Sequence, residues 1–122
     1  MTTLILVLFL LQLKHLVFDW LWQTSTEVNT KGNYGEWGGI THSLKHALGT
    51  WAVVFWFVDP ISAFLLSWLD GFVHYHIDWT KQNLGQQYGW TPTHPKFWWA
   101  MGADQTAHQL TYLLIGYMAM VM

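Results

Sequence analysis

The chain contains no cysteine and no arginine, and charged residues make up only 10% of its 122 positions. Without cysteine there can be no disulfides, no Cys-ligated zinc or iron–sulfur centres and no thiolate nucleophile, so any metal must be bound by nitrogen and oxygen. The cations are all lysine and the formal net charge is −2. This charge balance lacks the basic patch of a nucleic-acid-binding protein, so we expect no nucleic-acid partner.

Apolar residues are abundant instead. They make up 52% of the chain, which includes ten Trp, yet the mean hydropathy is only +0.21 because polar residues interrupt the apolar segments. This combination is typical of a membrane protein that crosses the bilayer several times around a polar interior. The length predicts one domain, residues 1–122. The composition predicts the lipid bilayer as its first partner.

Hydrophobic periodicity and turn residues predict four helices and no strands, at about residues 3–23, 40–58, 60–81 and 96–122. Each is near the roughly 20 residues that cross a bilayer core. The polar, Gly-rich stretches 24–39 and 82–95 are predicted to be loops. No cation precedes the apolar run Leu4–Leu11 and no small-residue cleavage site follows it, so we expect a retained helix rather than a signal peptide. The predicted fold is an all-α, four-transmembrane-helix bundle built from two helical hairpins.

Metal-capable side chains recur in pairs four residues apart, one pair in each predicted helix. Residues i and i+4 share one helix face, so each pair can point toward one centre. If the helices alternate in direction, all the pairs lie at one depth, with one set toward the loops and the other about 6 Å deeper. The loop-side set is Asp19, His42, Asp78 and Asp104, and the deeper set is His15, His46, His74 and His108. This coincidence predicts a shared site between the helices, with either two metals or one metal and neighbouring carboxylates.

Two further patterns support this arrangement. The spacing H-x3-D-W-x2-Q occurs at His15 and again at His74, which indicates two hairpins of similar plan. Lys31, Lys81 and Lys96 flank the loops that lie beside the predicted site. Because lysine accumulates on the cytoplasmic side of membrane proteins, the site is expected to face the cytoplasm.

Four motifs in order resemble the domain of unknown function 3307 family of small bacterial and phage integral membrane proteins. They are H-L-x2-D-x3-Q-T from His15, H-S-L-x-H from His42, H-x2-I-D-x2-K from His74 and D-Q-x2-H from Asp104. The stretch from His74 to Thr111 is most similar to the phage-encoded branch. The resemblance implies a multi-pass protein of the bacterial inner membrane and carries no activity. Thr41-His42-Ser43-Leu44 is also similar to part of a broader group of membrane proteins described as metal-dependent hydrolases, although most of that group's pattern is missing here.

The leading functional hypothesis is metal binding by eight residues: His15, Asp19, His42, His46, His74, Asp78, Asp104 and His108. Zinc fits this nitrogen and oxygen ligand set best, and iron, manganese or copper are alternatives. If the protein is an enzyme, which stays open, we expect metal-assisted hydrolysis of a phosphoester or lipid headgroup. Asp19, Asp78 and Asp104 are then the catalytic carboxylates, one of them a general base.

The same residues are compatible with other functions. The imidazoles could ligate haem or a redox metal in an electron-transfer or oxidase component. A metal-free polar network could instead support a non-catalytic assembly subunit, in a homo-oligomer or a larger membrane complex. Lys81 is a counter-ion, a phosphate contact or an interface lysine, and Asp70 is a proton carrier or a satisfied core acid. His76 and His94 are predicted to be bystanders.

Overall fold

The computed structural model describes all 122 residues and is entirely helical. Helix α1 (Thr2–Leu16) continues into a π-helical turn, η1 (Val17–Leu21). The short α2 (Ser25–Thr30) precedes α3 (Trp37–Val54), α4 (Pro60–Tyr88) and α5 (Pro95–Val121). The all-α prediction is therefore confirmed.

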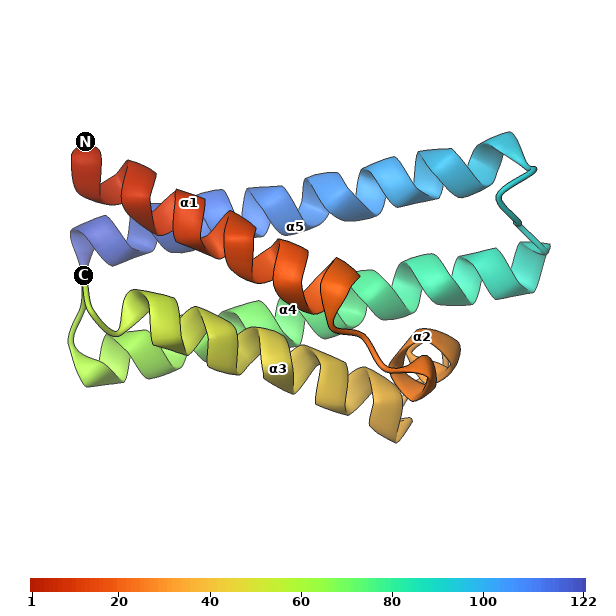
Figure 1. The fold of residues 1–122 in the computed structure, drawn as a ribbon, viewed down its shortest axis with the longest axis horizontal. Helices are drawn as coiled ribbons and strands as arrows, with labels where there is room; N and C mark the ends of the chain where they lie inside the picture. The colour runs from red at the N-terminus through yellow and green to blue at the C-terminus, as the bar shows by residue number, and fades with distance from the viewer.

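The four long helices form an up-and-down bundle (Figure 1). Both termini and the α3–α4 turn lie at one end, whereas α2 and the α4–α5 connection lie at the other. Helix α4 packs against α3 and α5, and α1 packs against α3 and α5 from the opposite side. The helices therefore alternate in direction, as the depth argument for the four pairs requires.

Two predicted loops are wrong in part. Residues 24–39 contain α2, which begins with a capping box: Thr24 Oγ1 accepts from the Glu27 N–H, and Glu27 Oε2 accepts from the Thr24 N–H. Helix α4 continues past the predicted end at residue 81 to Tyr88, because Gly85 alone does not end the helix. Gly89, at φ 64°, supplies the left-handed C-cap that favours glycine. At its other end α4 begins as predicted, with Asp59 as N-cap and Pro60 in the first turn.

Glycines allow the long helices to approach closely. A Cβ on Gly49 would lie 2.7 Å from Lys14 Cγ, and a Cβ on Gly71 would lie 2.9 Å from Ala47 Cβ. A Cβ on Gly116 would lie 2.8 Å from Leu8. The α1–α3, α3–α4 and α1–α5 crossings thus each depend on a small residue, as helix contacts in membranes commonly do.

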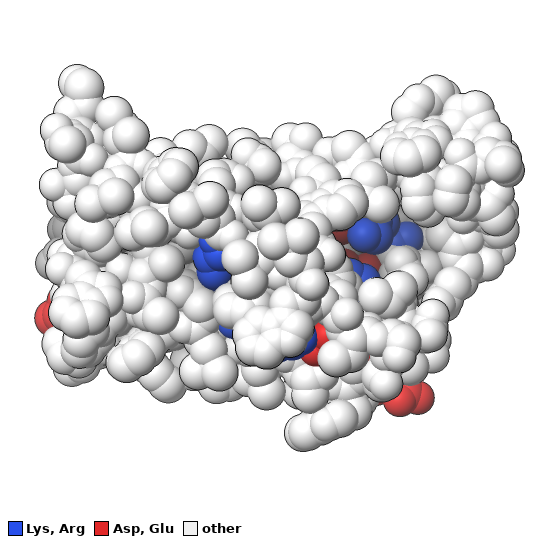
Figure 2. Space-filling view, viewed as in Figure 1, with Lys and Arg blue, Asp and Glu red and all other residues white.

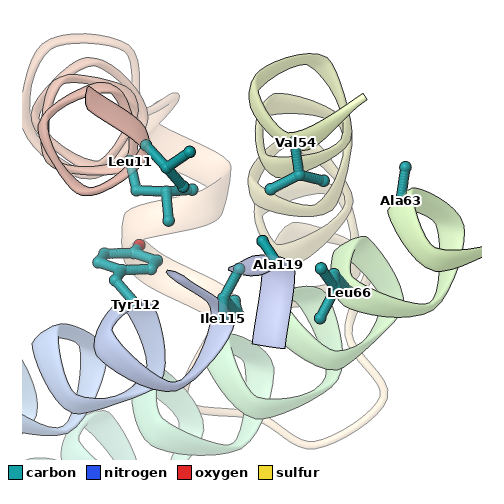
Figure 3. Close-up of a cluster of buried hydrophobic side chains, with 8 residues drawn as sticks. Leu11, Val54, Ala63, Leu66, Tyr112, Ile115 and Ala119 are labelled. Carbon is teal, nitrogen blue, oxygen red and sulfur yellow. The ribbon is translucent and has the colours of Figure 1, made fainter. Parts of the chain in front are cut away.

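A small apolar core occupies the end of the bundle that carries the termini. It draws on all four long helices (Figure 3) and consists of Val7, Leu11, Val54, Ala63, Leu66, Tyr112, Ile115 and Ala119. Tyr112 is its largest fully buried side chain. The phenol hydroxyl of Tyr112 hydrogen bonds to His15, so this residue joins the apolar core to the polar interior beside it.

The remaining interior is polar and the outside is apolar. Sixteen polar or charged residues are buried, against eight apolar ones, and the buried polar set includes Lys14, Lys31, Asp70 and Asp78. The face in Figure 2 is mostly uncharged, with a few scattered charged atoms and a group of them in a hollow between the end of α1, α4 and α5. Large apolar side chains such as Trp56, Ile61 and Trp99 are more than 70% exposed. This distribution is the reverse of the one expected in water.

One segment meets a length and hydropathy criterion for crossing a membrane. It is Thr2–Leu21, formed by α1 and η1, with a mean hydropathy of 1.9. No other helix of the chain meets this criterion, which considers length and composition alone.

Candidate metal centre

The four i,i+4 pairs meet inside the bundle, and all eight of their residues are buried. Three groups have ligand atoms within 4.8 Å of one another: Asp19/His42/His46/His74, His74/Asp78/His108 and Asp19/Asp104/His108. The groups share Asp19, His74 and His108, so they form one continuous cluster. Seven of the eight predicted residues belong to it, and His15 is the exception.

The first group converges on one carboxylate oxygen. Asp19 Oδ1 lies 3.1 Å from His42 Nε2, 3.8 Å from His74 Nε2 and 4.0 Å from His46 Nε2. The Nε2 atoms of His42 and His74 are 3.2 Å apart. Ligands about 2.0–2.2 Å from a tetrahedral zinc ion lie roughly 3.3–3.6 Å from one another, so these separations bracket those of a coordination shell.

The second and third groups lie beside the first. His108 Nε2 is 3.3 Å from Asp78 Oδ1 and 3.7 Å from Asp104 Oδ1. Asp78 Oδ2 faces the first group, 3.2 Å from His42 Nε2 and 3.7 Å from His74 Nε2. Asp78 therefore directs Oδ1 toward His108 and Oδ2 toward the first group, as a carboxylate between two metal ions would.

Several buried ligand atoms lack any hydrogen-bond partner. They include both ring nitrogens of His46, Nδ1 of His42 and His74, and Asp104 Oδ1. Unpaired buried polar atoms are costly and uncommon in folded proteins. A cation held by the first group would satisfy one of them, His46 Nε2.

The π-helical turn positions the first carboxylate. Its i→i−5 bond, from the Trp22 N–H to the Val17 carbonyl, is 2.7 Å long and widens the helix around Asp19. The Gln23 side-chain amide donates to the Asp19 carbonyl and supports the same turn. Single π turns in otherwise regular helices are frequent at functional sites.

His15 lies beside the cluster with both ring nitrogens engaged. Nδ1 is 2.9 Å from Tyr112 Oη, and Nε2 is 3.0 Å from Gln105 Oε1. Gln105 donates in turn to Asp104 Oδ2 at 2.9 Å and to Asp19 Oδ2 at 3.4 Å. In this arrangement His15 orients the carboxylates through Gln105, and its predicted role as a ligand stays a prediction.

Two lysines bind the cluster from the loop side. Lys31 Nζ donates to Asp78 Oδ2 at 2.8 Å and to Gln23 Oε1 at 3.1 Å, and Lys81 Nζ lies 3.5 Å from Asp104 Oδ2. Burial on its own lowers the pKa of Lys31, but the carboxylates of Asp78 and Asp19 outweigh it and raise that pKa above the ordinary lysine value. Lys31 therefore remains charged against the cluster.

A separate buried ion pair lies deeper in the bundle. Lys14 Nζ is 2.6 Å from Asp70 Oδ2, and Thr50 Oγ1 donates to the same oxygen at 2.6 Å. Lys14 also reaches the His46 carbonyl, at 3.4 Å. Sequence reasoning assigned Lys14 no role. The available signal was a lysine in the middle of an apolar helix, one position before a predicted ligand.

The residues predicted to be bystanders lie outside the cluster. His76 Nδ1 hydrogen bonds the Phe72 carbonyl on the outer side of α4, and His94 accepts from the Lys96 N–H as the N-cap of α5. Of the glutamines, Gln109 accepts a helix–helix hydrogen bond from Gln12 at 3.2 Å.

The fold and the cluster together define a class: all-helical proteins with buried histidines and aspartates gathered between four antiparallel helices. Residues 5–122 match the family described as "Protein of unknown function (DUF3307)", and the chain belongs to that family. The resemblance read from the four motifs is thereby confirmed. No curated protein and no solved structure matches the chain.

Proposed function

We propose that the chain is a four-pass membrane protein whose His/Asp cluster binds divalent metal, with zinc as the first candidate, and hydrolyses a phosphoester. The membrane part rests on the distribution of side chains. In soluble proteins charged residues are mostly exposed and large apolar side chains mostly buried, whereas a bilayer favours apolar residues outside and polar residues inside. The buried Lys14, Asp70 and Asp78 and the exposed Trp56 and Ile61 match the second pattern.

Low hydropathy in the later helices has a local cause. Helix α4 buries Ser67, Asp70, His74 and Asp78 along one face, and these side chains lower its mean hydropathy. The opposite face presents Phe64, Leu65, Trp68 and Phe72, each more than half exposed. Such a helix suits a bilayer only within a bundle that covers its polar face, and α3 and α5 cover it here.

One observation carries the metal proposal: histidine Nε2 atoms from α3 and α4 converge on Asp19 Oδ1 at 3.1–4.0 Å in a buried site. Without a cation, His46 has no partner for either ring nitrogen. The ligand set contains only imidazoles and carboxylates, which suit zinc and also iron or manganese.

Close packing of the imidazoles disfavours the haem alternative. The rings of His46 and His74 stack with centroids 3.5 Å apart, and those of His74 and His108 with centroids 4.1 Å apart. A macrocycle needs open space between its axial ligands and around them. These contacts leave room for ions between the ligand atoms rather than for a porphyrin.

The hydrolysis we propose follows from the carboxylates. A bound zinc ion lowers the pKa of its water to about 7 and stabilises charge on phosphate oxygens. With the metal held by the first group, Asp104 is the preferred general base, since its Oδ1 has no hydrogen-bond partner and its Oδ2 is held by Gln105 and Lys81. As the water oxygen bonds to phosphorus, Asp104 takes one of its protons, and Asp104 returns that proton to the leaving oxygen as the phosphorus–oxygen bond to the alcohol breaks.

Elemental analysis of detergent-purified protein tests the metal site. We expect bound metal in the wild type and a loss in His74→Ala and in the double variant His46→Ala/His108→Ala. His76→Ala is the matched control, because it removes an imidazole from the same helix outside the cluster. Wild-type protein that binds no metal, or His74→Ala that binds as much as His76→Ala, would refute the site.

A metal-free polar network remains the second candidate, and the ion pairs of Lys31 and Lys81 with cluster carboxylates favour it. It predicts that the cluster variants lose thermal stability to the same degree with and without a chelator. The metal hypothesis instead predicts that a chelator destabilises the wild type and leaves His74→Ala unchanged.

A further inference from the structure

A cavity of about 660 Å³ opens beside the metal cluster on the loop side of the bundle. It lies where η1, α2, α4 and α5 meet, and it reaches the cluster at Asp19, Lys31 and Gln105, which belong to its wall. Figure 2 shows this region as a hollow with blue and red atoms at its base. Its volume falls within the range of about 300–1,000 Å³ typical of small-molecule sites.

The polar part of the wall carries positive charge and amide groups. Lys31 and Lys81 line the cavity together with Gln23, Gln82, Gln86 and Gln105. The Lys81 ammonium group makes no hydrogen bond, and its one ion pair, with Asp104 Oδ2, is 3.5 Å long. Its ammonium group therefore has donors available to a ligand in the cavity.

The carboxylate in the wall does not make the cavity a cation site. Asp19 directs Oδ1 toward His42 and Oδ2 toward Gln105, so both of its oxygens are already engaged in the cluster. With metal bound there, the net charge facing the cavity is positive. A ligand that bridges the cluster and the two lysines must then be an anion.

The apolar part of the wall consists of Trp20, Val28, Trp90, Phe97, Ala100 and Met101. Trp20 is 58% exposed, and the cavity is open to the surroundings between α4 and α5. Tryptophan is enriched where membrane proteins meet the headgroup region. The wall thus offers contacts for an apolar group next to contacts for an anion.

We propose that this cavity binds the phosphate group of an amphiphilic phosphoester, with Lys81 and Lys31 as the phosphate contacts and the aromatic side chains against the apolar part. This deepens the proposed function and rests on it, since the cavity would present the phosphoester to the metal cluster. A lipid headgroup and a soluble phosphoester share this chemistry, and the experiment distinguishes them.

Two pairs of variants test the cavity. Lys81→Gln removes the available ammonium, and Lys96→Gln removes a charge from an exposed lysine that is not in the wall. Gly85→Leu fills the cavity from α4, and Gly102→Leu is its control on α5. A Cβ at either glycine meets no atom within 4 Å, so both substitutions preserve the helices and only the first enters the cavity.

Calorimetric titration of the detergent-solubilised full chain gives the readout. The probes are dihexanoyl phosphatidate, inorganic phosphate and dihexanoylglycerol, which has the same tails without phosphate. We expect phosphatidate to bind, Lys81→Gln to weaken it about tenfold, and Gly85→Leu to weaken it at least as much. Lys96→Gln and Gly102→Leu should match the wild type. Wild-type-like binding by both cavity variants, or equal binding of dihexanoylglycerol and phosphatidate, would overturn the proposal.

The remaining comparisons identify the source of the phosphate and separate the two proposals. Inorganic phosphate that binds as tightly as phosphatidate indicates a soluble ligand, and much weaker binding indicates a lipid; both support a phosphate site. Phosphate binding that depends on Lys81 in a protein without metal refutes the hydrolase alone. Metal in the cluster without binding of either phosphate probe refutes the cavity alone.

Discussion

Lys14 Nζ, from α1, lies 2.6 Å from Asp70 Oδ2, from α4, inside the bundle, and both side chains are at most 4% exposed. Thr50 Oγ1 donates to the same carboxylate oxygen, so one atom joins three helices. Removal of one charge would leave the other buried and unpaired, which is far more costly than removal of both.

The first prediction concerns this pair. Lys14→Met and Asp70→Leu should each lower the free energy of unfolding by about 3–5 kcal/mol, and the double variant should recover much of that loss. Denaturant or thermal unfolding in detergent measures all three. Losses that simply add in the double variant would show that the two charges are not coupled.

The second prediction tests how α2 is held against α3. A Cβ on Gly38 would overlap Thr30 Oγ1 and lie 2.7 Å from the Thr26 carbonyl oxygen, so Gly38→Ala must displace α2. We expect a loss of about 1–3 kcal/mol and faster proteolysis within residues 24–36. Gly85→Ala, whose Cβ meets nothing within 4 Å, should not be destabilised. Equal behaviour of the two variants would contradict the docked position of α2.

The third prediction is a pH dependence at Glu27, whose side chain accepts from Lys45 Nζ at 2.8 Å. Burial raises the pKa of this carboxyl, but the hydrogen bonds from Lys45 and from the Thr24 N–H outweigh it and hold the pKa below 4.5. A depressed pKa stabilises the fold above the unfolded-state value, and that stability disappears as the pH falls through the folded-state value.

The measurement follows thermal stability from about pH 6 to about pH 3, the range in which carboxylates titrate. Glu27→Gln should lose less stability over this range than the wild type. Glu36→Gln is the control, because Glu36 is an exposed carboxylate that caps no helix through its side chain. A Glu27→Gln profile parallel to that of the wild type would exclude the linkage.

The fourth prediction tests the four-pass topology and uses the absence of native cysteine. Asn33→Cys and Thr93→Cys lie at the loop end of the bundle, and Trp56→Cys lies at the end with the termini. An impermeant thiol reagent applied to spheroplasts should label Trp56→Cys and should label the other two only after lysis. Labelling of all three from one side would contradict the four-pass arrangement.

Much of the site could be predicted because helical spacing is a local property. The pairs of α3, α4 and α5 needed only regular helices of alternating direction to meet, and the structure has both. The π turn at Val17–Leu21 was not predictable from spacing, since i,i+4 reasoning assumes a regular helix. His15 and Asp19 nevertheless remain close, with His15 Nε2 3.5 Å from Asp19 Oδ2.

The missed features depend on contacts distant in sequence or on weak local signals. Lys14 and Asp70 are 56 positions apart, and their pairing depends on how α1 packs between α3 and α5. Helix α2 did have a local signal, the Thr24-x-x-Glu27 capping box, but Gly-rich surroundings obscured it. The predicted end of α4 at residue 81 is too early because a glycine-rich stretch favours a loop, although a single glycine such as Gly85 costs a helix only about 1 kcal/mol.

The polar face of α4 has a consequence for biogenesis in the proposed bilayer setting. Alone in lipid, α4 would expose Asp70, His74 and Asp78 to hydrocarbon. Asp70 acquires its counter-ion from α1 and Asp78 acquires Lys31 from the segment after α2, both of which precede α4 in the chain. The hairpin of α1 and α3 must therefore stay beside the site of insertion until α4 enters the bilayer. Insertion of α4 is then coupled to its packing against the earlier helices.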